Sequence, residues 1–304
     1  MAADLNLEQI TIVVTDSGLG GMSVAAELAA KLRALRAFRR VRIVFFNSSF
    51  SKDSGYNRLE KHGDKLRIFN HALESMHGKY APNLILIACN TLSILFPETA
   101  FARKKLVPVI GIVEAGANLI AEKLRSEPES RVILFGTQTT IDAGTHKRAL
   151  IDAGLEANRI IQQACPMLES VIEEDVESEQ TRCMISEFVR KALAKPGAHS
   201  DPFFASLNCT HYGYAMNFWR SAFIQQHRVP SDILNPNSRM LAFLDSPELA
   251  NRFSESIIEM EVVSRVEIRH RTIGSICKLL RHISPIAHAA LHQYQFNVNL
   301  FEIE

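Results

Sequence analysis

The stretch LILIACNTLSIL, residues 84–95, contains the pattern on which the rest of this chain is built. Its first four residues are branched and apolar, which is typical of a strand covered on both faces. They lead into Cys89, Asn90 and Thr91, after which the apolar spacing becomes helical. A buried strand that ends in a thiol and two small polar groups predicts a strand-to-helix turn that carries chemistry.

Similar apolar runs alternate with longer segments of helical spacing along most of the chain. The other strand-like runs are ITIVV (10–14), VRIVFF (41–46), VPVIGI (107–112), RVILFG (131–136) and FFASLN (203–208). The segments between them with helical spacing include 22–38, 58–77 and 140–153. This alternation predicts an α/β fold with mostly parallel sheets and crossover helices. In such folds, ligands bind beyond the carboxyl ends of the strands.

The composition excludes several classes of protein. The chain has 304 residues, and 34 Lys and Arg residues are balanced by 33 Asp and Glu, so it has no overall attraction for nucleic acid or an anionic membrane. Neither a signal-peptide pattern nor an apolar run of about 18 residues is present, which predicts a cytoplasmic protein. The 5 cysteines are odd in number and lack a C-x-x-C pair, which argues against a disulfide framework and a zinc knuckle.

Two predicted strand ends present a cysteine followed by small polar groups. Cys89 precedes Asn90, and Cys209 precedes Thr210 and His211. A lone cysteine after a strand is most often a small packing residue. The repetition favours a functional interpretation instead, with two α/β units that each contribute one thiol to a shared cleft.

The chemistry open to two thiols is proton transfer. A thiol is an acid with a pKa of about 8.5, and its thiolate is a base. Removing and replacing a proton on opposite faces of a carbon requires one group of each kind, and no cofactor. The nearby segment DSGLGGMS (16–23) is an incomplete dinucleotide fingerprint, because Ser23 occupies the last glycine position. It therefore predicts a helix N-terminus that can bind a carboxylate, and no nucleotide site.

Five segments of the chain resemble the signature segments of the cofactor-independent aspartate/glutamate racemases, most closely the glutamate racemases. They are TDSGLGGMSV (15–24), ACNTLS (88–93), GTQTTIDAGTHKRAL (136–150), CPMLESVIEED (165–175) and NCTHY (208–212). The resemblance implies an isomerase that interconverts L- and D-glutamate with neither cofactor nor metal and supplies D-glutamate for peptidoglycan. It also implies two similar doubly wound domains that face each other across a cleft.

The resemblance also assigns roles to individual residues. Cys89 and Cys209 would be the acid/base pair, with Asp16, His211 and Glu173 as catalytic partners, although Glu174 leaves the register at the last position open. The substrate contacts that it implies are Asp16, Ser17, Asn47, Ser48, Gly55, Tyr56, Asn90, Thr91, Thr137, Thr140, Thr210 and His211.

Departures from the family pattern keep the substrate open. The segment NSSFSKDSGYN (47–57) stands where these enzymes usually have G-D-T-A-R and then P-Y-G. Asn208 replaces a usual glycine, and Gly213 a usual proline. The alternatives are a racemase of aspartate or another amino acid, and a non-catalytic amino-acid-binding protein on the same scaffold. A hydrolase that uses Cys209 and His211 is disfavoured, since two positions along a turn are not expected to bring imidazole onto sulfur.

The domain boundaries follow from the same resemblance. We expect a first domain of residues 1–115 plus 231–304 and a second of residues 116–230. The part after about residue 245 reads mainly as helix, with SRVEIRH (264–270) as a candidate strand. The expected partner is a small amino-acid substrate, with no nucleic acid and no membrane, and a homodimer is compatible with the sequence.

Overall fold

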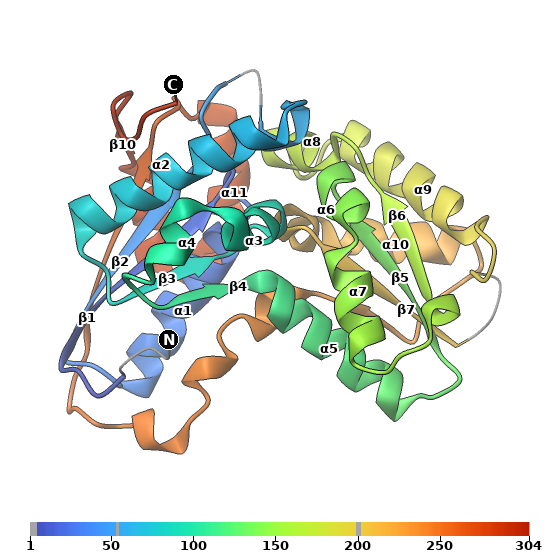
Figure 1. Ribbon diagram of the computed structural model, residues 1–304, viewed down its shortest axis with the longest axis horizontal. Helices are drawn as coiled ribbons and strands as arrows, with labels where there is room; N and C mark the ends of the chain where they lie inside the picture. The colour runs from blue at the N-terminus through green and yellow to red at the C-terminus, as the bar shows by residue number, and fades with distance from the viewer. Residues whose placement is uncertain (1–4, 53–54, 199–201, 304) are drawn as a thin grey trace. The chain divides into compact units, whose positions relative to one another are not determined.

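The computed structural model describes residues 5–52, 55–198 and 202–303 (Figure 1). The fold divides into two units, and the chain crosses between them twice. The first unit ends at Gly111 and resumes at Leu241, and the second runs from Ile112 to Met240. The sequence had placed these crossings near residues 115 and 231.

Among the described residues, the first unit forms a 6-stranded parallel sheet with the order β10-β9-β2-β1-β3-β4. Its strands are β1 (Gln9–Asp16), β2 (Arg40–Asn47), β3 (Leu84–Ile87), β4 (Val109–Gly111), β9 (Ile257–Ser264) and β10 (Gln295–Phe296). Two groups of helices cover the sheet (Figure 1). One group is α1 (Met22–Leu35), α11 (His270–Ile283) and α12 (Pro285–His292), and the other is α2 (His62–Tyr80), α3 (Asn90–Leu95) and α4 (Ala100–Lys104).

The second unit, over its described residues, forms a 4-stranded parallel sheet with the order β6-β5-β7-β8. Its strands are β5 (Arg131–Gly136), β6 (Ile160–Ala164), β7 (Phe203–Asn208) and β8 (Asp232–Leu234). Its helices are α5 (Ile112–Ser126), α6 (Gln138–Ala143), α7 (Thr145–Asp152), α8 (Leu168–Glu174), α9 (Glu179–Leu193) and α10 (Met216–Gln225). The short 3-10 turns within the described residues of both units are η1 (Tyr56–Arg58), η2 (Phe96–Glu98), η3 (Ala157–Arg159), η4 (Thr210–Ala215), η5 (Pro236–Arg239), η6 (Ala242–Leu244) and η7 (Pro247–Leu249).

The two sheets repeat one strand order. In each unit the first strand lies between the second and the third, and the third also pairs with the fourth, as β2-β1-β3-β4 and as β6-β5-β7-β8. Every residue of the third strands, β3 and β7, is buried. Cys89 and Cys209 follow these equivalent strands. The predicted parallel α/β units and their internal repetition are therefore confirmed.

The predicted helix over residues 140–153 is wrong in detail, because the segment forms two helices. Gly144 has φ +63°, a left-handed conformation that ends α6 and starts α7. The side chain of Thr137 caps α6 by accepting a hydrogen bond from the backbone N–H of Thr140 at 3.2 Å. Thr140 therefore lies in the first turn of α6 and does not open the helix.

The part after residue 245 consists mainly of helix, as predicted, because α11 and α12 make up most of its regular structure. It also adds β9 and β10 to the first sheet, and the position of β9 was not predicted. The candidate strand at residues 264–270 begins where β9 ends, at Ser264. The first five residues of β9 are exposed or half-buried and include two glutamates, so this part lacks the apolar run that marked the other strands.

The described part of the chain contains no helix that is long and apolar enough to cross a membrane.

Gly21 lies where the amino terminus of α1 passes close to the ends of β1 and β3. A Cβ atom at this position would lie 2.8 Å from Cβ of Ala88 and 2.9 Å from Oδ2 of Asp16. We predict that Gly21→Ala lowers the free energy of unfolding by about 1–3 kcal/mol, because it forces these segments apart. Urea unfolding followed by circular dichroism measures this change.

Gly274 provides the matched control for this substitution. It is an exposed glycine inside α11, and a Cβ there would meet nothing within 4 Å. Gly274→Ala should therefore raise stability by about 0.5–1 kcal/mol through helix propensity. Equal stabilities for Gly21→Ala and wild type would contradict the close approach.

Candidate active site

The carboxyl edge of the first sheet collects polar residues because its strands are parallel and in register. Asp16, the last residue of β1, pairs with Asn47, the last residue of β2. Asn47 in turn pairs with Ser264, the last residue of β9. Cys89 follows β3, which also pairs with β1, so the thiol reaches the same edge.

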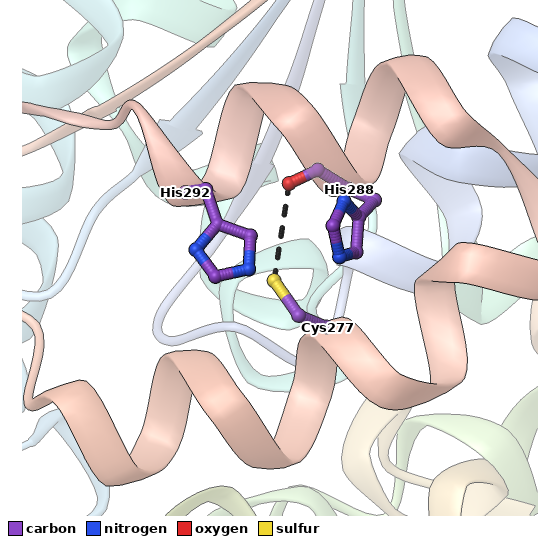
Figure 2. A group of neighbouring side chains, drawn as sticks. All are labelled: Cys277, His288 and His292. Atoms are coloured by element: carbon purple, nitrogen blue, oxygen red, sulfur yellow. Dashed lines mark hydrogen bonds between the residues drawn. The ribbon is translucent and has the colours of Figure 1, made fainter.

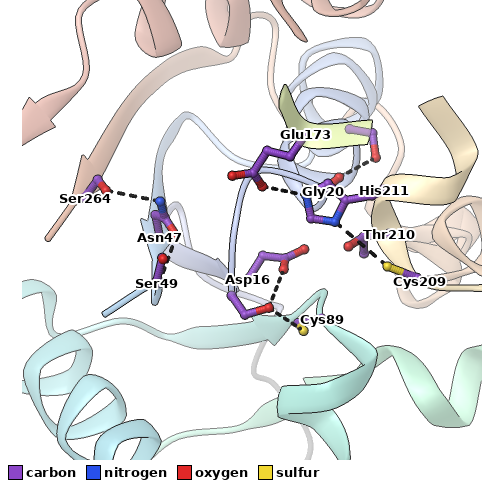
Figure 3. Close-up of polar contacts among 12 residues, drawn as sticks. Asp16, Gly20, Asn47, Ser49, Cys89, Glu173, Cys209, Thr210, His211 and Ser264 are labelled. Carbon is purple, nitrogen blue, oxygen red and sulfur yellow. Dashed lines mark hydrogen bonds and ion pairs between the residues drawn. The ribbon is translucent and has the colours of Figure 1, made fainter. Parts of the chain in front are cut away.

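Cys89 lies at the amino cap of α3 and is 6% exposed. Its sulfur is 3.2 Å from Oγ of Ser17, and Ser17 Oγ lies 3.5 Å from Oδ1 of Asp16 (Figure 3). Burial raises the pKa of the Cys89 thiol to about 12, and the negative charge of Asp16 acts in the same direction. The hydrogen bond with Ser17 opposes this shift only in part. In the free protein at neutral pH, Cys89 is therefore a thiol.

Two polar side chains near Cys89 are buried without a hydrogen-bond partner in the described structure. They are the Asn90 amide, at both its oxygen and its nitrogen, and the Tyr56 hydroxyl. Burial raises the pKa of Tyr56 well above its usual value, and the charge of Cys89 adds to the shift. An unsatisfied buried polar group costs about 1–3 kcal/mol, so these side chains are available to hydrogen-bond a ligand. Thr91 lies beside Asn90, with Oγ1 at 3.4 Å from Oδ1 of Asn57.

Asn47 and Ser48 are held by hydrogen bonds within the sheet edge. The Asn47 side chain accepts from the backbone N–H of Ser49 at 3.0 Å and donates to Oγ of Ser264 at 3.1 Å (Figure 3). Oγ of Ser48 lies 2.7 Å from Oγ1 of Thr15, and Ser48 is fully buried. These contacts give both residues a part in shaping the edge.

The loop before Tyr56 is described only in part. Asp53 and Ser54 lie outside the described residues. Gly55 has an extended backbone, and a Cβ there would meet nothing within 4 Å. The Gly55 position therefore has room for a side chain, and close packing does not require a glycine there.

The carboxyl edge of the second sheet repeats this arrangement. The last residues of β5 and β7, Gly136 and Asn208, form a register pair. Thr137 and Cys209 are the next residues along the two strands, so the pairing brings them to one edge. Oγ1 of Thr137 donates to Oγ1 of Thr140 at 3.0 Å, which holds the two threonines together.

Cys209 belongs to a chain of three polar side chains. Its sulfur lies 3.9 Å from Nδ1 of His211, and Nε2 of His211 lies 2.6 Å from Oε2 of Glu173 (Figure 3). His211 is therefore nearer to the sulfur than two positions along the chain had led us to expect. Glu174 is exposed, and Glu173 is the glutamate that contacts His211. A carboxylate on one ring nitrogen orients the imidazole and supports its charge beside the thiol.

The sequence did not identify two residues that support these edges. Ser264 contacts Asn47, as described above. The sequence analysis placed it at the start of a candidate strand, whereas it is the last residue of β9. Asn237 donates from Nδ2 to the backbone oxygen of Thr210 at 3.1 Å and thereby holds the turn after Cys209. The alternation of apolar and acidic residues over 258–262 could have predicted β9, and with it Ser264 at the strand end. No local pattern marks Asn237.

Comparison with known proteins gives this site a family. A sequence model of the Asp/Glu/Hydantoin racemase family matches residues 12–200. Glutamate racemase from Chlorobium phaeobacteroides is 29% identical over 204 residues, which cover 66% of this chain and 67% of that protein. Glutamate racemase from Aquifex aeolicus is 29% identical over 203 residues, 66% of this chain and 70% of that protein.

Solved structures share the fold. Glutamate racemase isoform RacE1 from Bacillus anthracis superposes with a TM-score of 0.66 at 19% identity, over 95% of this chain and 96% of that one. Glutamate racemase from Francisella tularensis in complex with D-glutamate superposes with a TM-score of 0.65 at 17% identity, over 96% of both chains. Since the family model covers more than half of the sequence, this chain belongs to the Asp/Glu/hydantoin racemase family.

Proposed function

We propose that this protein is a cofactor-independent racemase that interconverts L- and D-glutamate, with Cys89 and Cys209 as its two proton-transfer groups. The observation that carries the proposal is the position of both thiols, each within two residues of the end of the third strand of a repeated sheet. A protein that only bound an amino acid would need neither thiol. Glutamate is the substrate in the names of the relatives described above, and D-glutamate would serve peptidoglycan synthesis.

The reaction exchanges one proton at the α-carbon. One cysteine, as thiolate, removes the α-proton from one face, and the other, as thiol, delivers its proton to the opposite face. The α-carbon thus inverts, and the two cysteines exchange protonation states. The enzyme is then ready for the opposite enantiomer, so both directions use the same groups.

The surroundings of the two thiols suggest their resting states. Cys89, whose pKa is raised to about 12 by burial and by Asp16, would rest as the thiol and act first as the acid. Cys209 has His211 beside its sulfur, and an adjacent imidazolium stabilises a thiolate. Cys209 would therefore act first as the base, with Glu173 as the positioning residue of His211.

The negative charge that develops on the substrate needs hydrogen-bond donors, because no cofactor delocalises it. The Asn90 amide is buried and unpartnered beside Cys89, and it lies in the first turn of α3. We assign it to the substrate carboxylate, together with backbone N–H groups at the start of that helix. Tyr56, with its unpartnered hydroxyl, is the second candidate donor on this edge.

The substrate assignment is tested by racemisation of L-glutamate and L-aspartate side by side without added cofactor. We expect loss of optical rotation with both pure enantiomers of glutamate, and a kcat/KM for glutamate at least about tenfold above that for aspartate. A higher kcat/KM for aspartate or for a neutral amino acid would overturn the substrate and leave the two-thiol chemistry in place. No turnover of any amino acid would favour a binding protein.

The positioning role of Glu173 is tested against its neighbour. Glu173→Gln removes the charge that supports His211, and we expect kcat/KM to fall by roughly a hundredfold with an unchanged melting temperature. In the Glu173→Gln variant, iodoacetamide should also alkylate Cys209 more slowly than in wild type. Peptide mass spectrometry identifies Cys209 as the alkylated residue. Glu174→Gln is the matched control and should behave as wild type. Equal activities of the two variants would remove Glu173 from the mechanism.

A further inference from the structure

A second group of reactive side chains lies in the first unit, away from the edge that carries Cys89. Cys277 on α11 and the pair His288 and His292 on α12 converge between the two helices (Figure 2). One ligand atom from each, a sulfur or a ring nitrogen, lies within 4.8 Å of the other two. The two imidazole rings have their centroids 4.7 Å apart.

The hairpin of α11 and α12 brings the three side chains together. His288 and His292 are one helical turn apart, so both rings lie on the same face of α12. Ser284 joins the helices, and its hydroxyl caps α12 by accepting from the backbone N–H of Ala287 at 3.3 Å. This short connection packs α12 against α11 at the level of Cys277.

Hydrogen bonding within the protein does not account for this cluster. In the described part of the chain, neither imidazole makes a hydrogen bond, and the Cys277 sulfur has only a weak contact at 3.8 Å with the backbone oxygen of His288. A neutral imidazole is the form that binds metal ions.

We propose that Cys277, His288 and His292 bind a divalent transition-metal ion of the zinc type. One thiolate and two imidazoles suit zinc and cobalt and do not suit magnesium or calcium, which require oxygen ligands. In a tetrahedral zinc site, ligand atoms are separated by about 3.3–3.8 Å, so the three atoms need to approach by about 1 Å. His292 is exposed, which gives the ion a path of entry and leaves the fourth position to water.

The expected consequence is structural. On binding, the Cys277 thiol releases its proton to solvent, and the metal joins α11 to α12 by covalent coordination. Both helices pack on α1, so the ion would stabilise the folded first unit. Arg281 lies close enough to Cys277 to interact with it electrostatically, and its positive charge limits the affinity for a cation.

The test uses the full chain after removal of metal with a chelator. Titration with Co²⁺ should give the absorption bands of tetrahedral cobalt together with a thiolate-to-cobalt charge-transfer band, and these bands should saturate at one equivalent of the ion. Zn²⁺ should displace the cobalt and raise the melting temperature. Cys277→Ala should abolish the charge-transfer band, and His292→Ala should weaken Zn²⁺ binding by at least about a hundredfold.

The controls separate this site from other sites and from misfolding. His292 is exposed, so its replacement keeps the test valid if Cys277→Ala fails to fold. His282→Ala alters an exposed histidine that lies on α11 outside the cluster, and it should leave Zn²⁺ binding unchanged. Unaltered affinity in His292→Ala, or a charge-transfer band that persists in Cys277→Ala and is lost in Cys209→Ala, would overturn the proposal. So would the absence of the band in wild type.

Discussion

The parallel register of the two sheets is the constraint on which the candidate site depends. In each unit the third strand is buried at every position, and the residues that follow it come out at the same edge as those that follow the first strand. Cys89 is thereby brought beside Asp16 and Ser17, and Cys209 beside Thr137. A shift of one residue in either pairing would turn the side chains of the strand to the opposite face of the sheet.

The repeated scaffold gives the two thiols different electrostatic surroundings. Cys89 is buried next to the carboxylate of Asp16, which favours the neutral thiol, whereas Cys209 lies beside an imidazole that a second carboxylate supports. A two-base reaction requires this kind of difference, because one group must hold a proton when the other does not. In the proposed reaction, the ammonium group of the substrate would offset the charge of Asp16. Cys89 could then act as the base in the reverse direction.

The sequence predicted the strands that are buried on both faces, because a continuous apolar run is a local signal. The same signal located Cys89 and Cys209 at strand ends. It failed for β9, whose glutamates break the apolar run, and for the helix that Gly144 divides. The separate parts played by Asn47, tied into the sheet edge, and Asn90, buried without a partner, depend on tertiary contacts. No pattern of neighbouring residues could distinguish the role of Asn47 from that of Asn90. The choice between Glu173 and Glu174 likewise required the position of His211.

The central claim is that both thiols transfer the α-proton, and one experiment tests it most directly. L-Glutamate is incubated in deuterated water with wild type, Cys89→Ala, Cys209→Ala and, as control, Cys183→Ala, whose thiol is exposed. Formation of D-glutamate and its deuterium content at the α-carbon are measured by chiral chromatography and mass spectrometry. Wild type and Cys183→Ala should form deuterated D-glutamate, and the other two variants should form none. Turnover at the wild-type rate in Cys89→Ala or Cys209→Ala, or a product without deuterium, would contradict the two-thiol mechanism.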